Sequence, residues 1–380
     1  MMIAPRYGTG SLADLLPSLL GCFDVPGEHD RLGLALDITR VCVLLVDGLG
    51  ADALAAHPEA APFLTGTAPR RLTAGFPTTT ATSLSSFGTG LPPGEHGIIG
   101  YLLRLPEYDR IFDPLGWRLH GTHRKGELLE QLPPEKFQPH PTVFERAAAQ
   151  GISVTHVAPR QLAGSGLTRL ALRGAVFRPN TSIGDLVAGI TDALRSAPRT
   201  LVYAYHADLD TTGHVRGPSA RSWLLELGHV DRIAADIAAQ LPPDAALIVT
   251  SDHGMVELDR RIDYDTHDDL RAGVHALGGE ARARHVYTVE GATTDVRAAW
   301  TQLLGPDFLV LTRAEAIERG WFGPRVHPHI VERIGDLVVV ALGAGGITRS
   351  TVEPVQSTLV GQHGSLTSAE MNVPLCVFTP

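Results

Sequence analysis

Residues 41–50 read VCVLLVDGLG, and this stretch decides the fold. Residues 41–46 are a continuous apolar run rich in valine and leucine, which is typical of a parallel strand buried on both faces. The run ends at Asp47 and Gly48, and the residues from about 51 onward favour a helix. The stretch therefore predicts a strand, a loop and a helix, the repeating unit of α/β proteins.

The same order of strand and helix recurs along the chain. The strand-like runs, each after a helix-like segment, are 153–157 after 141–150, 201–205 after 183–194, and 245–250 after 219–240. This alternation predicts an α/β fold with a mostly parallel central sheet and helices on both faces.

The sequence pattern changes between about 259 and 343. Here the strand-like and helix-like segments are short and are joined by glycine and proline. We expect a smaller α+β cap at residues 261–342, inserted into a discontinuous catalytic core of residues 1–260 and 343–380. A second stretch, 102–140, is irregular, rich in proline and aromatic residues, and forms a candidate pocket wall.

Composition excludes several classes of protein. The 380 residues include 41 acidic and 32 basic side chains, so a net charge of −9 argues against binding to a nucleic-acid polymer. The three widely separated cysteines do not suggest a disulfide framework.

Neither a signal peptide nor a bilayer-spanning run is indicated. We expect a cytoplasmic protein without a membrane partner; the sequence does not indicate its oligomeric state.

Several carboxylates follow the predicted strands. Asp47, Asp208, Asp210 and Asp252 all come directly after strand-like runs, and the carboxyl ends of parallel strands meet at one edge of the sheet, where ligands bind. Carboxylates gathered at this edge would repel one another unless a cation lay among them.

Three histidines add metal-ligand character to this edge. Asp252 and His253 are adjacent, and Asp210 and His214 share one helical face, so each pair can reach one ion. His363 lies between small residues near the C-terminus. Taken singly, each motif is also compatible with a turn, a helix cap or an exposed loop histidine.

A hydroxyl-rich stretch, FPTTTATS at residues 76–83, precedes a predicted helix. A hydroxyl at a helix start suits attack on an anionic phosphoryl group, although helix capping is the more common role of such residues. A G-x-S-x-G elbow is missing from the sequence, so activation of the hydroxyl would have to come from a metal.

The order of these residues resembles the alkaline phosphatase superfamily, and within it the nucleotide pyrophosphatase/phosphodiesterase family. The resemblance extends from about residue 41 to residue 380 and implies an alkaline phosphatase-like fold and two divalent metal ions, with Zn²⁺ as the expected metal. The matching residues are Asp47, Thr80, Asp210, His214, Asp252, His253 and His363.

The resemblance also assigns roles. One metal is expected at Asp210, His214 and His363, and the other at Asp47, Asp252 and His253, with the Thr80 oxygen completing the second set. Thr80 is the expected nucleophile because it lies nine residues before Thr89, as in the family, and Thr79 is the alternative. The implied activity is two-metal hydrolysis of phosphodiester or pyrophosphate bonds in a nucleotide-like or other small phosphate ester, through a phosphothreonine intermediate.

The substrate pocket departs from the family pattern. Tyr101 replaces an asparagine that helps to hold a phosphoryl oxygen, and Ala81 replaces an aromatic residue of the nucleobase slot. Tyr205 matches the other side of that slot, but is equally compatible with a core aromatic. A phosphomonoesterase, a phosphonate hydrolase, a phosphomutase and a non-catalytic metal-binding protein therefore remain alternatives.

Overall fold

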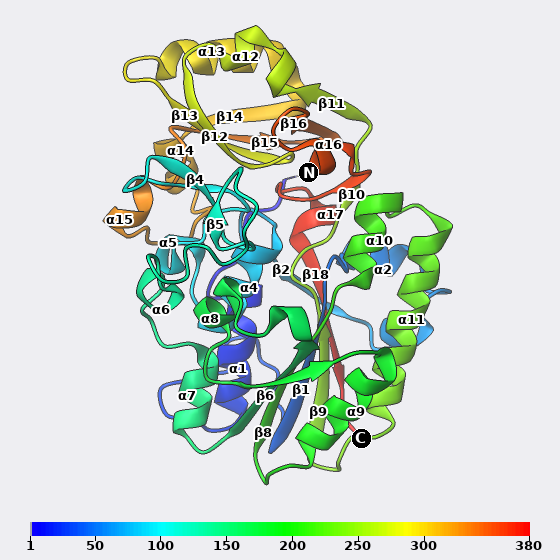
Figure 1. Ribbon diagram of the computed structural model, residues 1–380. Coiled ribbons are helices and arrows are strands. Elements are labelled where there is room, and N and C mark those ends of the chain that lie inside the picture. Colours follow the sequence, from blue (N-terminus) through cyan, green and yellow to red (C-terminus); the bar gives the residue numbers. More distant parts are fainter. Residues whose placement is uncertain (1) are drawn as a thin grey trace.

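The computed structural model describes residues 2–380, and a seven-stranded sheet forms its centre (Figure 1). The strand order is β2-β18-β9-β1-β8-β6-β7. Strands from β9 to β7 pair in parallel, whereas β18 is antiparallel to both β9 and β2. The mostly parallel sheet predicted from the sequence is confirmed. The strands are β1 Arg40–Val46, β2 Arg70–Thr73, β6 Ser153–Pro159, β7 Val176–Asn180, β8 Thr200–His206, β9 Ala245–Thr250 and β18 Asn372–Phe378.

Helices cover both faces of this sheet, because consecutive side chains of a buried strand point in opposite directions. Val43 and Leu45 lie in one core with α1, α4, α7 and α8, whereas Leu44 and Val46 lie in a second core with α2, α9 and α11. Burial of each such side chain contributes about 1.5–3 kcal/mol. The helices are α1 Leu15–Cys22, α2 Ala51–Ala56, α3 Pro62–Thr65, α4 Thr80–Thr89, α7 Val143–Ala149, α8 Gly166–Ala171, α9 Ile183–Leu194, α10 Asp208–Arg216 and α11 Arg221–Ala238.

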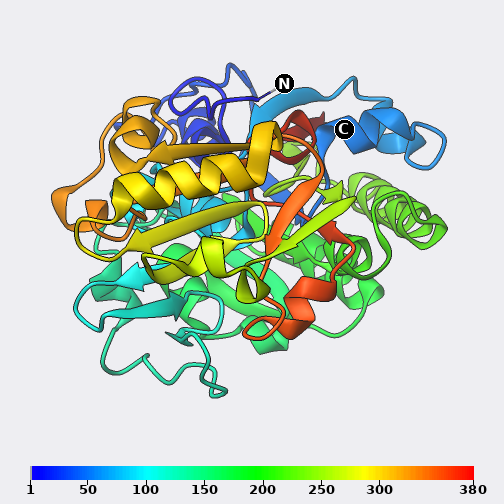
Figure 2. The same ribbon diagram turned by 90° about the horizontal axis from the view of Figure 1, so that it is seen from above.

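A smaller antiparallel sheet, in the order β12-β13-β15-β14, lies within the range expected for the cap. Helix α13 covers its outer face (Figure 2), where Trp300 and Val339 share a core. Val338 and Val340 point the other way and join the main core, so the cap packs tightly on the catalytic half. The elements are β12 Val274–Glu280, β13 Ala283–Thr288, α13 Thr293–Leu304, β14 Phe308–Thr312, α14 Arg313–Glu318 and β15 Leu337–Ala341.

The remaining elements are short. The stretch 102–140, expected to be irregular, contains a small sheet of β3, β4 and β5. The strands are β3 Leu103–Leu105, β4 Arg110–Asp113, β5 Arg118–Leu119, β10 Val256–Glu257, β11 Arg260–Asp263, β16 Gly345–Thr348 and β17 Gly361–Gln362. The helices are α5 Pro93–His96, α6 Pro134–Phe137, α12 Asp268–Arg271, α15 Pro328–Val331, α16 Pro354–Thr358 and α17 Ser368–Met371, with 3-10 turns η1 Leu12–Asp14, η2 Arg160–Leu162, η3 Tyr264–Thr266 and η4 Gly305–Asp307.

Within residues 2–380, none of the helices combines the length and apolar character needed to cross a bilayer. The cysteines at positions 22, 42 and 376 are free thiols, as their spacing in the sequence suggested.

A buried ion pair joins the β12–β13 hairpin of the cap to the core. The Nε and Nη2 atoms of Arg282 donate to the two carboxylate oxygens of Glu370 in α17, at 3.0 Å and 2.7 Å. Neither side chain is exposed to solvent. Glu370 also accepts a hydrogen bond from the backbone N–H of Ser365, close to the histidine at position 363. The cap is therefore fixed to the segment that supplies one of the expected metal ligands.

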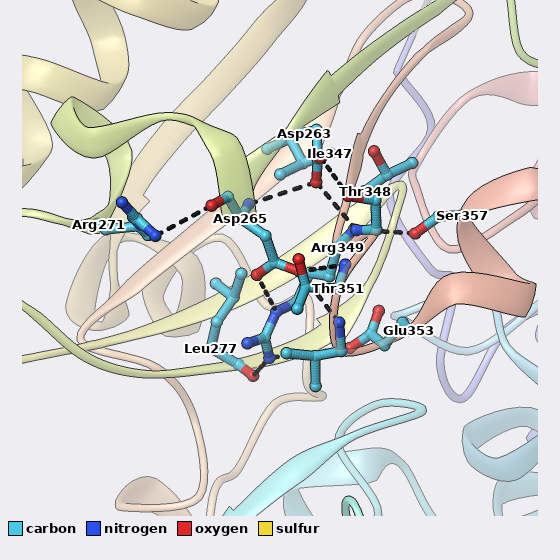
Figure 3. A network of polar contacts seen from close by, with 12 residues as sticks. Asp263, Asp265, Arg271, Leu277, Ile347, Thr348, Arg349, Thr351, Glu353 and Ser357 are labelled. Atoms are coloured by element: carbon cyan, nitrogen blue, oxygen red, sulfur yellow. Dashed lines mark hydrogen bonds and ion pairs between the residues drawn. The ribbon is translucent and has the colours of Figure 1, made fainter.

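A second polar network connects the cap to the wall of the main cavity (Figure 3). Asp265 accepts hydrogen bonds from the Arg349 side chain at 3.4 Å and from the Thr351 backbone N–H at 2.9 Å. These contacts hold the start of a segment whose residues 355–357 line the cavity. The network thus positions a wall that belongs to neither sheet.

We expect Glu370→Ala to reduce the free energy of unfolding by about 3–5 kcal/mol, because Arg282 would be left buried without a partner. Urea denaturation measures this loss. Glu135 provides the control, since it pairs with Arg169 at the surface and its replacement by alanine should cost under about 1 kcal/mol. Equal losses in the two variants would contradict the structural role of the Arg282–Glu370 pair.

Candidate active site

The carboxyl ends of β1, β8 and β9 bring the three expected aspartates together. Asp47 follows β1, Asp210 lies in the first turn of α10 after β8, and Asp252 follows β9. Gly48 has a φ of 74°, and its backbone N–H donates to Asp252 at 3.3 Å. A Cβ on Gly48 would lie 3.0 Å from Asp210, so glycine permits this close approach of the two loops.

Two groups of ligand atoms result from this convergence. In the first, Asp210, His214 and His363 place one ligand atom each within 4.8 Å of one another. The Nε2 atom of His214 lies 3.3 Å from Asp210 Oδ2 and 3.3 Å from His363 Nε2. The structure therefore gathers the three residues that the sequence grouped around one metal.

The second group consists of Asp47, Asp252 and His253, which meet the same 4.8 Å limit. The Nε2 atom of His253 lies 3.4 Å from Asp47 Oδ1 and 3.5 Å from Asp252 Oδ2. The rings of His253 and His363 stack with centroids 3.6 Å apart, so the two groups adjoin. The sequence-predicted ligands thus form two neighbouring sites.

Backbone carbonyls orient all three histidines. The Nδ1 atoms of His214, His363 and His253 lie 2.8 Å, 2.7 Å and 3.1 Å from the carbonyl oxygens of Gly361, Thr78 and Gly254, respectively. A carbonyl only accepts hydrogen bonds, so each Nδ1 carries the proton and each Nε2 presents a lone pair. This arrangement is typical of metal-ligating histidine.

The buried charges require compensation. Within residues 2–380, Asp47 Oδ1, Asp210 Oδ1 and Asp252 Oδ2 are buried without a hydrogen-bond partner. Burial raises the pKa of Asp252 to about 6, and burial together with the Asp252 charge raises that of Asp47 well above its usual value. Burial also lowers the pKa of His253 to about 4. Unpaired oxygens and neutral imidazoles converging on two points fit a pair of divalent cations.

The threonine expected as nucleophile lies at the edge of the second group. Thr80 is the first residue of α4, and its Oγ1 lies 3.3 Å from His253 Nε2. The Thr78 hydroxyl is already used, since it donates to the Ser365 carbonyl and accepts from the Gly364 N–H. Thr79 is the N-cap residue of α4. Among the three threonines, the Thr80 hydroxyl is the one within hydrogen-bonding distance of a ligand atom in residues 2–380.

A cavity of about 690 Å³ opens over both groups. Tyr101 and Tyr205 line it, and the Tyr205 hydroxyl donates to Asp47, so Tyr205 contacts the site as well as the pocket. Ala81 does not line the cavity, contrary to the sequence-based expectation: it is fully buried on the side of α4 that faces the core. Trp117 and other residues of 102–140 form one wall, as expected.

Sequence reasoning missed one residue in this cavity. Glu280 lies at the end of β12 in the cap, is 8% exposed, and lines the cavity. Neither of its carboxyl oxygens forms an ion pair among the described residues, and burial raises its pKa to about 8, outweighing the lowering effects of the Thr79 hydroxyl and the Arg284 charge. The signal was unavailable in the sequence, because it depends on how the cap folds back over Gly364.

The fold is alkaline phosphatase-like, and its two ligand groups are candidate sites for divalent metal ions. The chain belongs to the type I phosphodiesterase / nucleotide pyrophosphatase family, whose model matches residues 41–366. A comparison with curated protein sequences gives no match.

Solved structures share the fold. Murine ectonucleotide pyrophosphatase/phosphodiesterase 5 in complex with AMP is 21% identical, with a TM-score of 0.69 over 90% of this chain and 88% of that one. Phosphonoacetate hydrolase from Sinorhizobium meliloti in complex with phosphonoformate is 22% identical, with a TM-score of 0.66 over 90% of each chain. The human ectonucleotide pyrophosphatase/phosphodiesterase 5 is 21% identical, with a TM-score of 0.66 over 90% of this chain and 88% of that one.

We expect Thr80→Ala to lower turnover by about 10³-fold or more while leaving the metal content near that of the wild type, because three other ligands remain at that ion. Thr79→Ala is the matched control and should retain activity within about tenfold. Steady-state kinetics and elemental analysis measure both effects. An active Thr80→Ala enzyme beside an inactive Thr79→Ala enzyme would transfer the role to Thr79.

The raised pKa of Asp252 gives a pH-dependent prediction for metal-free protein. The folded state holds a proton that the unfolded state loses near pH 4, so the wild type loses stability as pH rises from about 4 to about 6, and the loss levels off above that range. Asp252→Asn should therefore gain stability over the wild type between pH 4 and pH 7, by an amount on the order of 1–3 kcal/mol.

Denaturant titrations of both chelator-treated proteins at several pH values measure this difference, which includes the change at Asp47 because the Asp252 charge raises the pKa of that neighbour. In zinc-loaded protein the sign should reverse, because asparagine removes a charged ligand. A stability difference that is constant across pH in the metal-free proteins would contradict the unpaired state of Asp252.

Proposed function

We propose that this protein is a two-metal phosphodiesterase or pyrophosphatase that cleaves small phosphate esters with Thr80 as the nucleophile. One observation carries the proposal: three histidine Nε2 lone pairs and three unpartnered aspartate oxygens converge on two adjoining points beside a free threonine hydroxyl. Membership of the phosphodiesterase family supports the same reaction class.

The donor sets favour Zn²⁺ or a similar ion at both positions, since each combines carboxylate and imidazole ligands. Asp210, His214 and His363 would hold one ion, and Asp47, Asp252 and His253 the other. Such ions lower the pKa of a nearby hydroxyl and neutralise charge on the attacking and leaving oxygens. Each of the three aspartates also leaves one carboxyl oxygen without a hydrogen-bond partner among the described residues.

The protein's own residues position the reaction. Thr80 lies at the N-terminus of α4, where free backbone N–H groups favour an anionic phosphoryl group. After losing its proton, Thr80 Oγ1 forms a bond to phosphorus while the bond between phosphorus and the leaving oxygen breaks. Water then hydrolyses the resulting phosphothreonine and regenerates Thr80. Tyr205 keeps Asp47 in place throughout by its hydrogen bond.

The charges in the cavity favour a singly charged phosphodiester over a doubly charged monoester. Of the two basic side chains that line the cavity within residues 2–380, Arg284 is paired with Glu353 at 3.0 Å, and Lys125 lies on the outer wall. Glu280 adds a buried carboxyl group that forms no ion pair and carries a negative charge above about pH 8. A substrate with less negative charge is therefore better accommodated.

The size of the cavity suits a leaving group larger than a simple alcohol. Leu84, Leu115 and Leu129 supply apolar surface, and a volume of about 690 Å³ falls in the usual range for ligand sites. A nucleoside fits this description, and the AMP complex of the murine relative is consistent with it. Zinc as the metal and a cytoplasmic location stay predictions from the sequence.

We expect kcat/KM on bis(p-nitrophenyl) phosphate to exceed that on p-nitrophenyl phosphate by at least about tenfold, because the pocket disfavours a dianion. In assays at about pH 9, where Glu280 is ionised because its pKa is about 8, Glu280→Gln should raise the monoester rate about five- to tenfold, since roughly 1 kcal/mol of repulsion is relieved. Glu135→Gln, at the surface, is the control and should change neither rate.

The same panel separates the alternatives. A faster monoester rate that Glu280→Gln leaves unchanged would favour a phosphomonoesterase. Hydrolysis of phosphonoacetate in preference to both esters would favour a phosphonate hydrolase, whereas isomerised sugar phosphate without free phosphate would indicate a mutase. Zinc binding without turnover of any substrate would leave a non-catalytic protein.

A further inference from the structure

A third cluster of potential ligands lies behind the active site, where β8, α10 and α11 meet. His206 is the last residue of β8, Asp208 is the first residue of α10, and Glu226 lies in α11. One ligand atom from each lies within 4.8 Å of the others. None of these residues belongs to the two groups in the active site.

The strand geometry explains why this cluster is separate. Tyr205 lines the catalytic cavity, and its neighbour His206 points to the opposite face of the sheet because side chains alternate along a strand. Val202 and Ala204 point to the same face of the sheet as His206, because they precede it by an even number of residues. Both pack in the core formed with α11. The imidazole therefore faces α11 rather than the substrate.

The His206 imidazole is buried, and one of its two nitrogens lacks a hydrogen-bond partner among the described residues. The residue is 7% exposed, and its Nε2 atom is buried with no hydrogen-bond partner among residues 2–380. The Glu226 carboxylate is the nearest acidic group, at 3.5 Å, beyond good hydrogen-bonding distance. A buried polar atom without a partner is unfavourable, and a bound cation would offset this cost.

The two carboxylates also lack cationic partners. In the described part of the chain, neither Asp208 nor Glu226 forms an ion pair with lysine or arginine. Glu226 faces only imidazoles: His206 through one oxygen, and His229 through the other at 3.4 Å. One imidazole nitrogen and two carboxylates are donors that suit a divalent first-row metal ion.

We propose that His206, Asp208 and Glu226 form a third divalent-cation site, for Zn²⁺ or Mn²⁺, that is distinct from the catalytic pair. The ion joins the end of a central strand to the first turn of one helix and the flank of another. Water can complete its coordination, because Asp208 is exposed to solvent. The site is structural rather than catalytic, as it lies outside the substrate cavity.

The position of this site gives it an influence on the active site. Helix α10 begins at Asp208 and carries both Asp210 and His214, and the His206 carbonyl accepts the Asp47 backbone N–H at 2.9 Å. A cation at this junction would fix the backbone that supplies ligands to both catalytic groups. This influence rests on the proposed function, whereas binding of the third ion does not.

Metal stoichiometry tests the proposal. Full-length protein is reconstituted with Zn²⁺, passed through a gel-filtration column in zinc-free buffer, and analysed by inductively coupled plasma mass spectrometry. We expect three zinc ions per wild-type chain and two in Asp208→Asn and in Glu226→Gln. Asp236→Asn removes a carboxylate from α11, the helix that carries Glu226, but outside the cluster. This variant should retain three zinc ions.

The outcomes separate this proposal from the proposed function. Equal zinc content in the wild type, Asp208→Asn and Glu226→Gln would overturn it, as would a third ion that washes off in zinc-free buffer while two remain. Asp208 is exposed, so its replacement should leave folding intact, which circular dichroism checks. Three zinc ions in the wild type and two in both Asp208→Asn and Glu226→Gln, in a protein inactive on every phosphate ester, would uphold this site and refute the proposed function.

Discussion

The structure depends on the burial of three carboxylates side by side at the ends of three parallel strands. Asp47, Asp210 and Asp252 leave one oxygen each without a protein partner, and burial raises the pKa of each. Such a cluster is unfavourable by itself, because like charges repel and desolvation penalises ionisation. It becomes favourable when divalent cations lie among the carboxylates. Metal binding and the stability of this edge of the sheet are therefore coupled.

The rest of the site is arranged around that constraint. Three histidines are held by backbone carbonyls, so their orientation follows from the loops and does not require additional side chains. The cap then sets the character of the pocket. Its Arg282–Glu370 pair fixes the hairpin to α17, and Glu280, at the end of β12, brings an unpaired carboxyl group into the cavity. The core thus supplies the two groups of candidate metal ligands, while the cap contributes a buried carboxyl group to the cavity above them.

Much of this could be predicted from the sequence, because the signals are local. The run 41–46 and its repeats gave the central strands, and residues directly after strands had to meet at one edge. Features that depend on distant pairing were not predictable. Strand β2 is short with two exposed arginines, and β18 contains a proline, so neither resembles a central strand until the two pair. Ala81 was misplaced because a helix start does not reveal which face meets the core, and Glu280 and the His206 cluster arise only from tertiary contacts.

The most direct test of the central claim is an anomalous difference map at the zinc edge from crystals of active, zinc-loaded protein. The structure predicts two adjoining peaks, one within about 2.1 Å of the Nε2 atoms of His214 and His363, and the other within the same distance of His253 Nε2. Fully active crystals with no metal density at these nitrogens would contradict it, and so would coordination through Nδ1.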